Sequence, residues 1–476
     1  DPTTFKNRST PAPSTRSMAC KAQTSGRIYL HSGPRTELHE IIRQEYARHQ
    51  DRAVPRNTLR QAVQGMLDTF AYQNFDAAEG EYTNRCCRPP RETEMRPWRL
   101  VTEIGWTGGG VLAYPLVLCR DALGADAEAP LAAAMSGEQL FDRIADAYNE
   151  NSGLLNDLMA PNAAGSQVNG WWTGYGLVKD CHCAYTVGSA VHYLTKTMDY
   201  LHQNGKPCPA KWMDAAQKVL HTVMDLQRAD GAFGYTYSTQ ERKVLDWSGF
   251  AGCWFAPALV YLYRLTGEER CLHSAEKALD YYHTFVKDLN CYGTPMDTWK
   301  AVDEEGNLAF MRGSRLLYEQ TGKAEFLQYM KDSAGYEFLW RYGYKTYPEH
   351  TPLNQGWSAC GGAVTSVSNP HIHPMGVIID TDLRYLARVT GDGYYASRAA
   401  DSAAWMLQCL ELYPAATGYG RYGILSERWC PSDGLDVERF SDGRPFSSWF
   451  SHNLWASACV LEAACELLLE IEHKKG

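Results

Sequence analysis

The sequence lacks the features that would place the protein in a membrane or on nucleic acid. No stretch of its 476 residues approaches the ~20 consecutive apolar residues that a membrane span needs, so we expect no membrane partner. Lys and Arg are fewer than Asp and Glu, form no long run, and leave a formal net charge of −9. Because phosphate binding needs a basic face, we also expect no nucleic-acid partner.

Spaced C-x-x-C pairs, which are typical of structural zinc sites, are missing as well. Cys86-Cys87 and Cys181-His182-Cys183 match that pattern poorly, so we expect no metal and no other cofactor. The 15 cysteines are an odd number, and many lie in helix-forming stretches as small apolar residues. We therefore expect a reducing, cytoplasmic compartment, with secretion as the alternative if a signal peptide was removed.

Three segments divide the chain by composition. Residues 1–30 are rich in Ser, Thr, Pro and Arg, which predicts a tail or linker. Residues 31–56 contain a predicted helix from Pro34 to Arg48 and a connection. Residues 57–476 predict one large repetitive domain with the catalytic function. Membership of a larger multidomain chain and homo-oligomerisation both agree with this organisation.

A repeated Thr-Gly turn organises the large domain. Thr266-Gly267, Thr321-Gly322 and Thr390-Gly391 each join an apolar helix to an amphipathic one, and glycine ends a helix there without a Cβ clash. Degenerate helix pairs precede them at 106–150 and 183–227. Two helices remain, 57–73 and 449–472. If these two pair, twelve helices close into an all-α ring of six hairpins with no exposed apolar edge.

This helix order, the Thr-Gly turns and the QRADGAFG segment at 227–234 resemble the six-hairpin glycosidase superfamily over roughly residues 57–472. The resemblance implies an (α/α)6 toroid in which the first helix of each hairpin lines the ring. It also implies a carbohydrate-active enzyme with its site in the funnel at the N-terminal ends of those helices. Polysaccharide lyases and terpene cyclases use α/α toroids too, so the fold alone does not choose the reaction.

Long connections at one rim are predicted to build the site, because the Thr-Gly turns at the other rim are short. They are 75–105, 151–182, 228–246, 288–305, 343–372 and 413–448. Aromatic rings could stack on the apolar faces of sugars, or could only pack the loops onto the ring. The predicted sugar-binding aromatics at this rim are Trp106, Trp172, Tyr185, Trp247, Trp299, Trp357 and Trp429.

Glycoside hydrolysis usually needs one protonated and one ionised carboxyl group. Asp246 is the first candidate for the acid, because it precedes an inner helix and Trp247 could form an apolar wall that raises its pKa. Asp180 or Glu103 is the predicted partner. For Asp246 and Asp180 the competing interpretation is a plain helix N-cap.

Two histidines lie close together between prolines in the segment 366–374. His371 and His373 would point to the same side of an extended strand, where they could bind sugar hydroxyls. They could also be ordered loop residues, a metal site or a lyase base. Arg428 is a further candidate for sugar binding. The first long loop carries a cluster of arginines that could bind an anionic glycan, or could be solvated loop charge balanced by Glu92 and Glu94: Arg85, Arg88, Arg91, Arg96 and Arg99.

The sequence therefore predicts a glycoside hydrolase that acts on oligosaccharide ends, with uronate-containing or other anionic glycans among its expected substrates. Two alternatives stay open. One is a polysaccharide lyase with a His or Tyr base, and the other is a non-catalytic carbohydrate-binding module.

Overall fold

The computed structural model describes most of the predicted large domain. It covers residues 32–49, 52–76, 81–86, 96–100, 102–104, 109–124, 128–159, 167–168, 170–172, 177–294, 300–346, 358–410, 412, 423, 425, 427–429, 448–449, 451–452 and 454–473. The chain divides into two compact units, Asp1–Pro34 and Arg35–Gly476, and the second unit contains the helical ring. None of the helices in the described ranges is long and apolar enough to cross a membrane.

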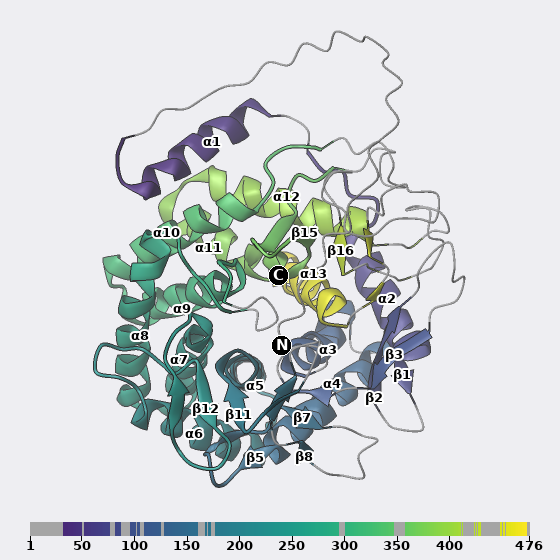
Figure 1. Cartoon of the computed structure of the whole chain (residues 1–476). Coiled ribbons are helices and arrows are strands. Elements are labelled where there is room, and N and C mark those ends of the chain that lie inside the picture. The colour runs from purple at the N-terminus through teal and green to yellow at the C-terminus, as the bar shows by residue number, and fades with distance from the viewer. Residues whose placement is uncertain are drawn as a thin grey trace, which may run out of the picture. The chain divides into compact units, whose positions relative to one another are not determined.

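Helices form two concentric layers (Figure 1). The inner layer contains α3 (Gly110–Leu123), α5 (Ala184–Gln203), α7 (Phe255–Thr266), α9 (Glu305–Thr321), α11 (Asp380–Thr390) and α13 (Leu454–His473). The outer layer contains α2 (Leu59–Thr69), α4 (Glu128–Asp146), α6 (Ala210–Asp225), α8 (Glu269–Lys287), α10 (Ala324–Trp340) and α12 (Gly393–Cys409). Short helical segments extend or precede some of them: η2 (Phe70–Asn74), η4 (Ala251–Trp254) and η5 (Met375–Ile379).

The ring closes where the two ends of the domain meet. Helix α13 packs against both α2 and α3, so the helices predicted at 57–73 and 449–472 form the sixth hairpin. The other five hairpins pair α3 with α4, α5 with α6, α7 with α8, α9 with α10, and α11 with α12. The (α/α)6 toroid predicted from the sequence is confirmed. Outside it, η1 (Arg35–Glu37) leads into α1 (Leu38–Arg48), which packs on α10.

The Thr-Gly turns end three inner helices as predicted. Gly267, Gly322 and Gly391 are the C-caps of α7, α9 and α11, with φ angles of 73°, 65° and 70°. In each turn the threonine hydroxyl donates to the carbonyl four residues back, for example from Thr321 to Leu317 at 2.7 Å. These left-handed caps reverse the chain, so all inner helices run in the same direction.

Replacing Gly322 by alanine is expected to lower the free energy of unfolding by about 1 kcal/mol. An added Cβ at Gly322 meets no atom within 4 Å, so the loss reflects the left-handed backbone alone. Gly393 has equally open surroundings without a positive φ and begins α12. Gly393→Ala is therefore the matched control and should leave stability unchanged or higher. Urea unfolding of both variants checks this, and equal losses would contradict it.

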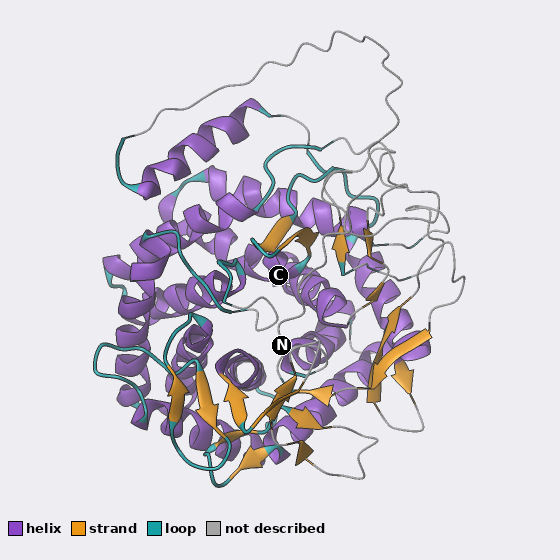
Figure 2. Cartoon of the chain, viewed as in Figure 1, coloured by secondary structure: helices purple, strands orange, loops and turns teal. Residues whose placement is uncertain are grey.

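Short antiparallel strands lie within the long connections, which the sequence predicted as loops apart from the extended segment at His371 and His373. Figure 2 shows them in separate small groups beside the helices. The strands are β1 (Phe75–Asp76), β2 (Glu81–Cys86), β3 (Arg96–Leu100), β4 (Thr102–Glu103), β5 (Tyr148–Asn149), β6 (Leu154–Leu155), β7 (Leu158–Met159), β8 (Gln167–Val168), β9 (Gly170–Trp172), β10 (Leu177–Lys179), β11 (Cys181–Cys183), β12 (Thr236–Ser238), β13 (Val244–Asp246), β14 (Ala363–Ser366), β15 (Asn369–His373), β16 (Arg428–Trp429), β17 (Ser448–Trp449) and β18 (Ser451–His452).

Four of the described sheets join connections that precede neighbouring inner helices, and two of the four contain Asp246, His371 and His373. The sheet β11-β12-β13 links the connection before α5 to the one before α7. The sheet β14-β15-β16-β17 links the connection before α11 to the one before α13. Backbone pairing therefore fixes these segments against one another at the N-terminal ends of the inner helices.

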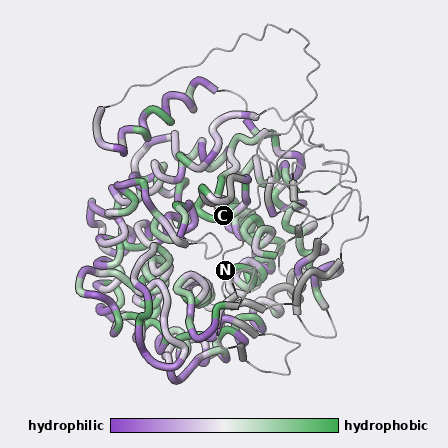
Figure 3. Tube along the Cα trace, viewed as in Figure 1, coloured by the Kyte–Doolittle hydropathy of each residue, from purple (hydrophilic) through white to green (hydrophobic). Residues whose placement is uncertain are grey.

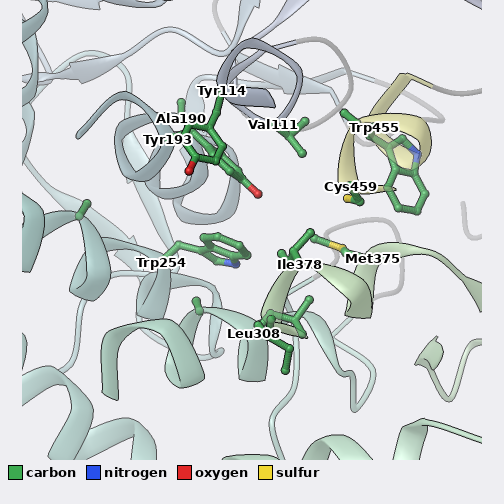
Figure 4. Packing of buried hydrophobic residues seen from close by; sticks show 14 of the residues in the cluster. Val111, Tyr114, Ala190, Tyr193, Trp254, Leu308, Met375, Ile378, Trp455 and Cys459 are labelled. Carbon is green, nitrogen blue, oxygen red and sulfur yellow. The ribbon is translucent and has the colours of Figure 1, made fainter. Parts of the chain in front are cut away.

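Apolar side chains fill the interior of the ring. Figure 3 shows hydrophobic residues concentrated on α3 and α13, with hydrophilic stretches on the outer helices. In Figure 4, Trp254, Ile378, Met375 and Cys459 converge on the centre from η4, η5 and α13. The rings of Trp254 and Phe255 are fully buried. These residues form a close-packed apolar layer within the ring.

A buried ion network crosses this core. Lys196 Nζ of α5 lies 2.7 Å from Oε1 of both Glu462 and Glu466 of α13, and Arg312 of α9 pairs with Glu462. The Arg312 guanidinium also donates to the Ile378 carbonyl at 2.8 Å. Burial alone would raise the pKa of Glu466, but Lys196 and Arg312 lower it to about 2. The network links three inner helices and η5 through charges that are costly to bury unpaired.

Candidate functional site

Polar and aromatic side chains gather at the N-terminal ends of the inner helices. Tyr185 lies in the first turn of α5, Glu305 begins α9 and Met375 begins η5. The Tyr185 hydroxyl is 3.9 Å from Met375 Sδ, and its ring centroid is 6.0 Å from that of Trp254. Within the described ranges the Trp254 indole N–H is buried without a hydrogen-bond partner. We call Tyr185, Trp254, Glu305 and Met375, together with Trp455 in the first turn of α13, the lumen cluster.

Glu305 supplies the carboxylate of the lumen cluster. Its side chain is buried, and it occupies the first turn of α9, where the helix dipole favours a negative charge. Burial raises the pKa of Tyr185 well above its ordinary value, and the charge and hydrogen bonding of Glu305 raise it further. Tyr185 is therefore a neutral hydroxyl beside the carboxyl group of Glu305.

A second carboxyl group precedes Glu305 directly but points elsewhere. Glu304 lies beside Glu337 of α10, and a Cβ built at Gly376 would fall 2.4 Å from Glu304 Oε1 and 3.1 Å from Glu337 Oε1. Burial, followed by the charge of Glu337, raises the pKa of Glu304 well above its ordinary value. Arg341 forms an ion pair with Glu337, with Nη2 lying 2.7 Å from Oε1. Glu304 therefore favours its protonated form more strongly than an exposed glutamate does.

The hairpin of β14 and β15 brings the two predicted histidines to the same end of the ring. His371 and His373 are both buried, and the backbone N–H of Glu304 donates to the Thr365 carbonyl of β14 at 2.8 Å. The His373 ring stacks on Trp455, with centroids 5.9 Å apart at 19°. His373 Nδ1 is 2.9 Å from the His371 carbonyl, which can only accept. Nδ1 therefore carries a hydrogen.

Asp246 has a different environment from the one predicted. It ends β13, its Oδ2 lies 2.6 Å from Lys300 Nζ, and its Oδ1 accepts from the Ser248 N–H at 2.8 Å. Partial burial alone would raise the pKa of Asp246, but Lys300 and Ser248 outweigh it and lower the pKa. The expected rise is therefore not found. Trp247 lies instead under Arg228, whose Cζ is 5.1 Å from the ring centroid.

Asp180 and Asp246 do not face each other in the sheet. The register of β11, β12 and β13 aligns Cys183, Thr236 and Asp246, whereas Asp180 precedes β11. Asp180 also adopts a left-handed φ of 61° and is exposed. A catalytic role for either residue remains a prediction.

The structure describes the remaining predicted site residues to different extents. Trp429 is buried in β16, opposite Ile372 of β15. The backbones of Glu103, Trp172 and Arg428 lie in β4, β9 and β16. Glu103 is one residue before Ile104, whose carbonyl accepts from the first N–H of α3 at 2.8 Å. The side chains of these three residues lie outside the described part, as do those of the arginine cluster and the whole of Trp106, Trp299 and Trp357.

Sequence reasoning missed Glu304 and Glu305. The signal was present as three consecutive acidic residues, Asp303-Glu304-Glu305, directly before an inner helix. Asp303 caps this turn, because its carboxylate accepts from the backbone N–H groups of Thr294 and Gly306. In the described ranges no group of three or more His, Cys, Asp or Glu side chains is arranged to hold a metal ion.

The Cys181-His182-Cys183 segment forms strand β11. His182 is fully buried, and its Nε2 lies 2.8 Å from Ser152 Oγ. Burial lowers the pKa of His182 to about 4. The unfolded chain therefore takes up a proton near pH 6.5 while the folded chain resists it.

The protein is expected to lose roughly 3 kcal/mol of stability through His182 as the pH falls from 6.5 to 4. The contribution is fully present above pH 6.5, because both states are then neutral at this residue. His182→Gln should flatten the pH dependence of urea unfolding in that window, whereas exposed His273→Gln should not. An unchanged slope in His182→Gln would contradict the assignment.

The chain is similar in structure, but not in sequence, to solved proteins. Neither a protein-family model nor a curated protein sequence matches the chain. A solved D-mannose isomerase matches over 87% of this chain and 97% of that chain, with 11% identity and a TM-score of 0.54. Cellobiose 2-epimerase from Spirochaeta thermophila matches over 93% and 100%, with 13% identity and a TM-score of 0.55. A family 76 glycoside hydrolase (mannosidase) from Bacteroides thetaiotaomicron matches over 87% and 99%, with 14% identity and a TM-score of 0.53.

The sequence identities are too low to transfer an activity to this chain. The structural matches support the fold alone. The three proteins carry different names on one architecture. The chain has the (α/α)6 six-hairpin fold that its resemblance implied.

Proposed function

We propose that the chain is a carbohydrate-processing enzyme, that its site is the lumen cluster, and that it hydrolyses a glycosidic bond at an oligosaccharide end. The observation that carries the proposal is the Glu305 carboxylate beside the neutral Tyr185 hydroxyl at the N-terminal end of an inner helix. A buried carboxylate at this position can stabilise the positive charge that develops on the sugar ring or activate a water.

Hydrolysis also needs a proton donor, and Glu103 is the proposed partner of Glu305. Glu103 ends β4 and leads through Ile104 into α3, which is a neighbour of α5 and α13 in the inner layer. Its backbone is therefore tied to the same end of the ring as Glu305. Trp455, in the first turn of α13, supplies an aromatic ring beside His373, and the indole N–H of Trp254 is a donor without a partner in the described part of the chain.

Proton transfer at C2 of a reducing sugar is the second candidate. The position of His373 at this end of the ring favours it, because a neutral imidazole can accept a proton from carbon while Tyr185 or Glu305 orients the sugar. Two of the similar solved structures are named as a sugar isomerase and a sugar epimerase.

One experiment separates these reactions. The full chain is incubated in deuterated water with mannobiose, mannose, cellobiose and a uronate oligosaccharide, and proton NMR is recorded. Hydrolysis gives new reducing-end signals in proportion to the bonds lost, with no deuterium at C2. Deuterium at C2 without bond cleavage supports the isomerase or epimerase instead, and a new vinyl proton identifies a lyase. A folded protein that changes none of the four sugars would contradict carbohydrate processing on this panel.

A further inference from the structure

A cavity outside the ring is lined by an arginine that forms no ion pair with any residue the structure describes. The cavity has a volume of about 450 Å³ and lies between α1, the end of α10 and strand β14. Its volume falls in the range of small-molecule sites, about 300–1,000 Å³. Figure 1 shows α1 lying beyond the outer helices, so this cavity is separate from the lumen cluster.

Arg398 of α12 lines the cavity and is 1% exposed. Its Nη2 donates to the Arg341 carbonyl at 2.7 Å, but its Nη1 is buried without a hydrogen-bond partner in the described part of the chain. Among the same residues it forms no ion pair. Its strongest charge interactions are with Tyr394, Arg341 and Tyr46, and none of these is a carboxylate. An arginine stays charged in a protein, and burying it unpaired is costly.

Nη1 of Arg398 lies close to Gly343 in the wall of the cavity. A Cβ built at Gly343, which also lines the cavity, would lie 3.2 Å from Nη1. Glycine at this position leaves room for a ligand atom to approach the guanidinium. The other cation of the lining, Arg341, is already paired with Glu337 and Asp380, and the acidic lining residue, Glu45, is paired with Arg48.

Aromatic rings form the walls around this charge. Tyr344 lies 5.4 Å from Tyr342 and 5.7 Å from His49 between ring centroids, and Tyr46 lies under Arg398 at 4.7 Å. Tyr344 is 46% exposed, so the rings open to solvent at one side. Such rings bind a flat or ring-shaped body, while the guanidinium binds an anion.

We propose that this cavity binds a ring-sized organic carboxylate, with the carboxylate on Arg398 Nη1 and the ring against the wall that Tyr342 and Tyr344 form. A guanidinium with one edge occupied and one edge open matches a single carboxylate group. Sugar acids and aromatic acids share this chemistry, and direct binding distinguishes them. The inference does not depend on the reaction at the lumen cluster.

Titration calorimetry of the full chain tests it with D-glucuronate and 4-hydroxybenzoate, and with the neutral counterparts glucose and 4-hydroxybenzamide. We expect one of the acids to bind, its neutral counterpart to bind at least about ten-fold more weakly, and Arg398→Gln to weaken the acid to a similar extent. Glu305→Gln should leave this binding unchanged, which separates the cavity from the lumen cluster.

Arg398→Gln could fail to fold, because Arg398 also holds the Arg341 carbonyl. Tyr344→Ala removes an exposed wall of the cavity and serves as the second variant, with exposed Tyr72→Ala as its matched control. Weaker binding of the acid in Tyr344→Ala but not in Tyr72→Ala supports the proposal. Binding unchanged in Tyr344→Ala, no binding of either acid to the wild type, or equal binding of an acid and its neutral counterpart would each overturn it.

Discussion

Replacing Glu305 by glutamine is expected to lower kcat about a thousand-fold on whichever sugar the wild type turns over. Glutamine keeps the size of the side chain and its hydrogen bonding to Tyr185, but removes the negative charge that the reaction uses. Because the change is isosteric, the urea midpoint should move little. Initial rates of the purified variant at saturating substrate measure the effect.

The matched control for Glu305→Gln is Glu269→Gln. Glu269 is the first residue of the outer helix α8, as Glu305 is of the inner helix α9. It therefore reports any general effect of removing a first-turn charge, and its activity should be unchanged. Asp246→Asn belongs in the same assay, because the sequence predicted Asp246 as the acid. Full activity in Glu305→Gln with a large loss in Asp246→Asn would move the site from the lumen cluster to the β13 edge.

Replacing Arg312 by methionine is expected to lower the free energy of unfolding by about 3–5 kcal/mol. Arg312 is 4% exposed and pairs with Glu462, which is fully buried. The variant would leave Glu462 with Lys196 as its remaining cation while Glu466 competes for the same ammonium. Urea unfolding followed by circular dichroism gives the loss from the shift in midpoint.

Arg388→Met is the control for the ion network. Arg388 also pairs with a glutamate of α13, Glu470 at 2.7 Å, but its side chain is 50% exposed. An exposed pair of this kind contributes about 0–1 kcal/mol. Equal losses in Arg312→Met and Arg388→Met would show that burial does not set the strength of the network.

The fold could be predicted from the sequence because its signals are local. A Thr-Gly turn at the end of an apolar helix identifies a hairpin without knowledge of its partner, and three such turns established the repeat. Ring closure was predicted because five helix pairs left one unpaired apolar helix at each end of the domain. Each of these helices buries its apolar face if the two pair with each other. Apart from the extended segment at His371 and His373, the strands in the connections were not predicted, because most of them have only two or three residues and no periodicity to detect.

The site could be predicted only as a region. The polarity of the ring placed it at the N-terminal ends of the inner helices, where Tyr185, His371 and His373 are found. The pKa shift of Asp246 was predicted with the wrong sign because Lys300 was not considered. Lys300 lies 54 residues away in sequence and lowers the pKa of Asp246 through a contact that exists only in the folded chain. Glu305 was overlooked because its partner Tyr185 is brought to it by ring closure.

The most direct test of the proposed site is a crystal structure of the Glu305→Gln variant with the sugar that the wild type turns over. Sugar density is expected at the N-terminal ends of the inner helices, within hydrogen-bond distance of residue 305 and in contact with Trp254 or Trp455. A second cavity of about 280 Å³ lies among the ion-paired side chains, lined by Lys196, Arg312 and Glu466. Density there, or beside Asp246 and Lys300, with none at residue 305 would contradict the placement of the site at the lumen cluster.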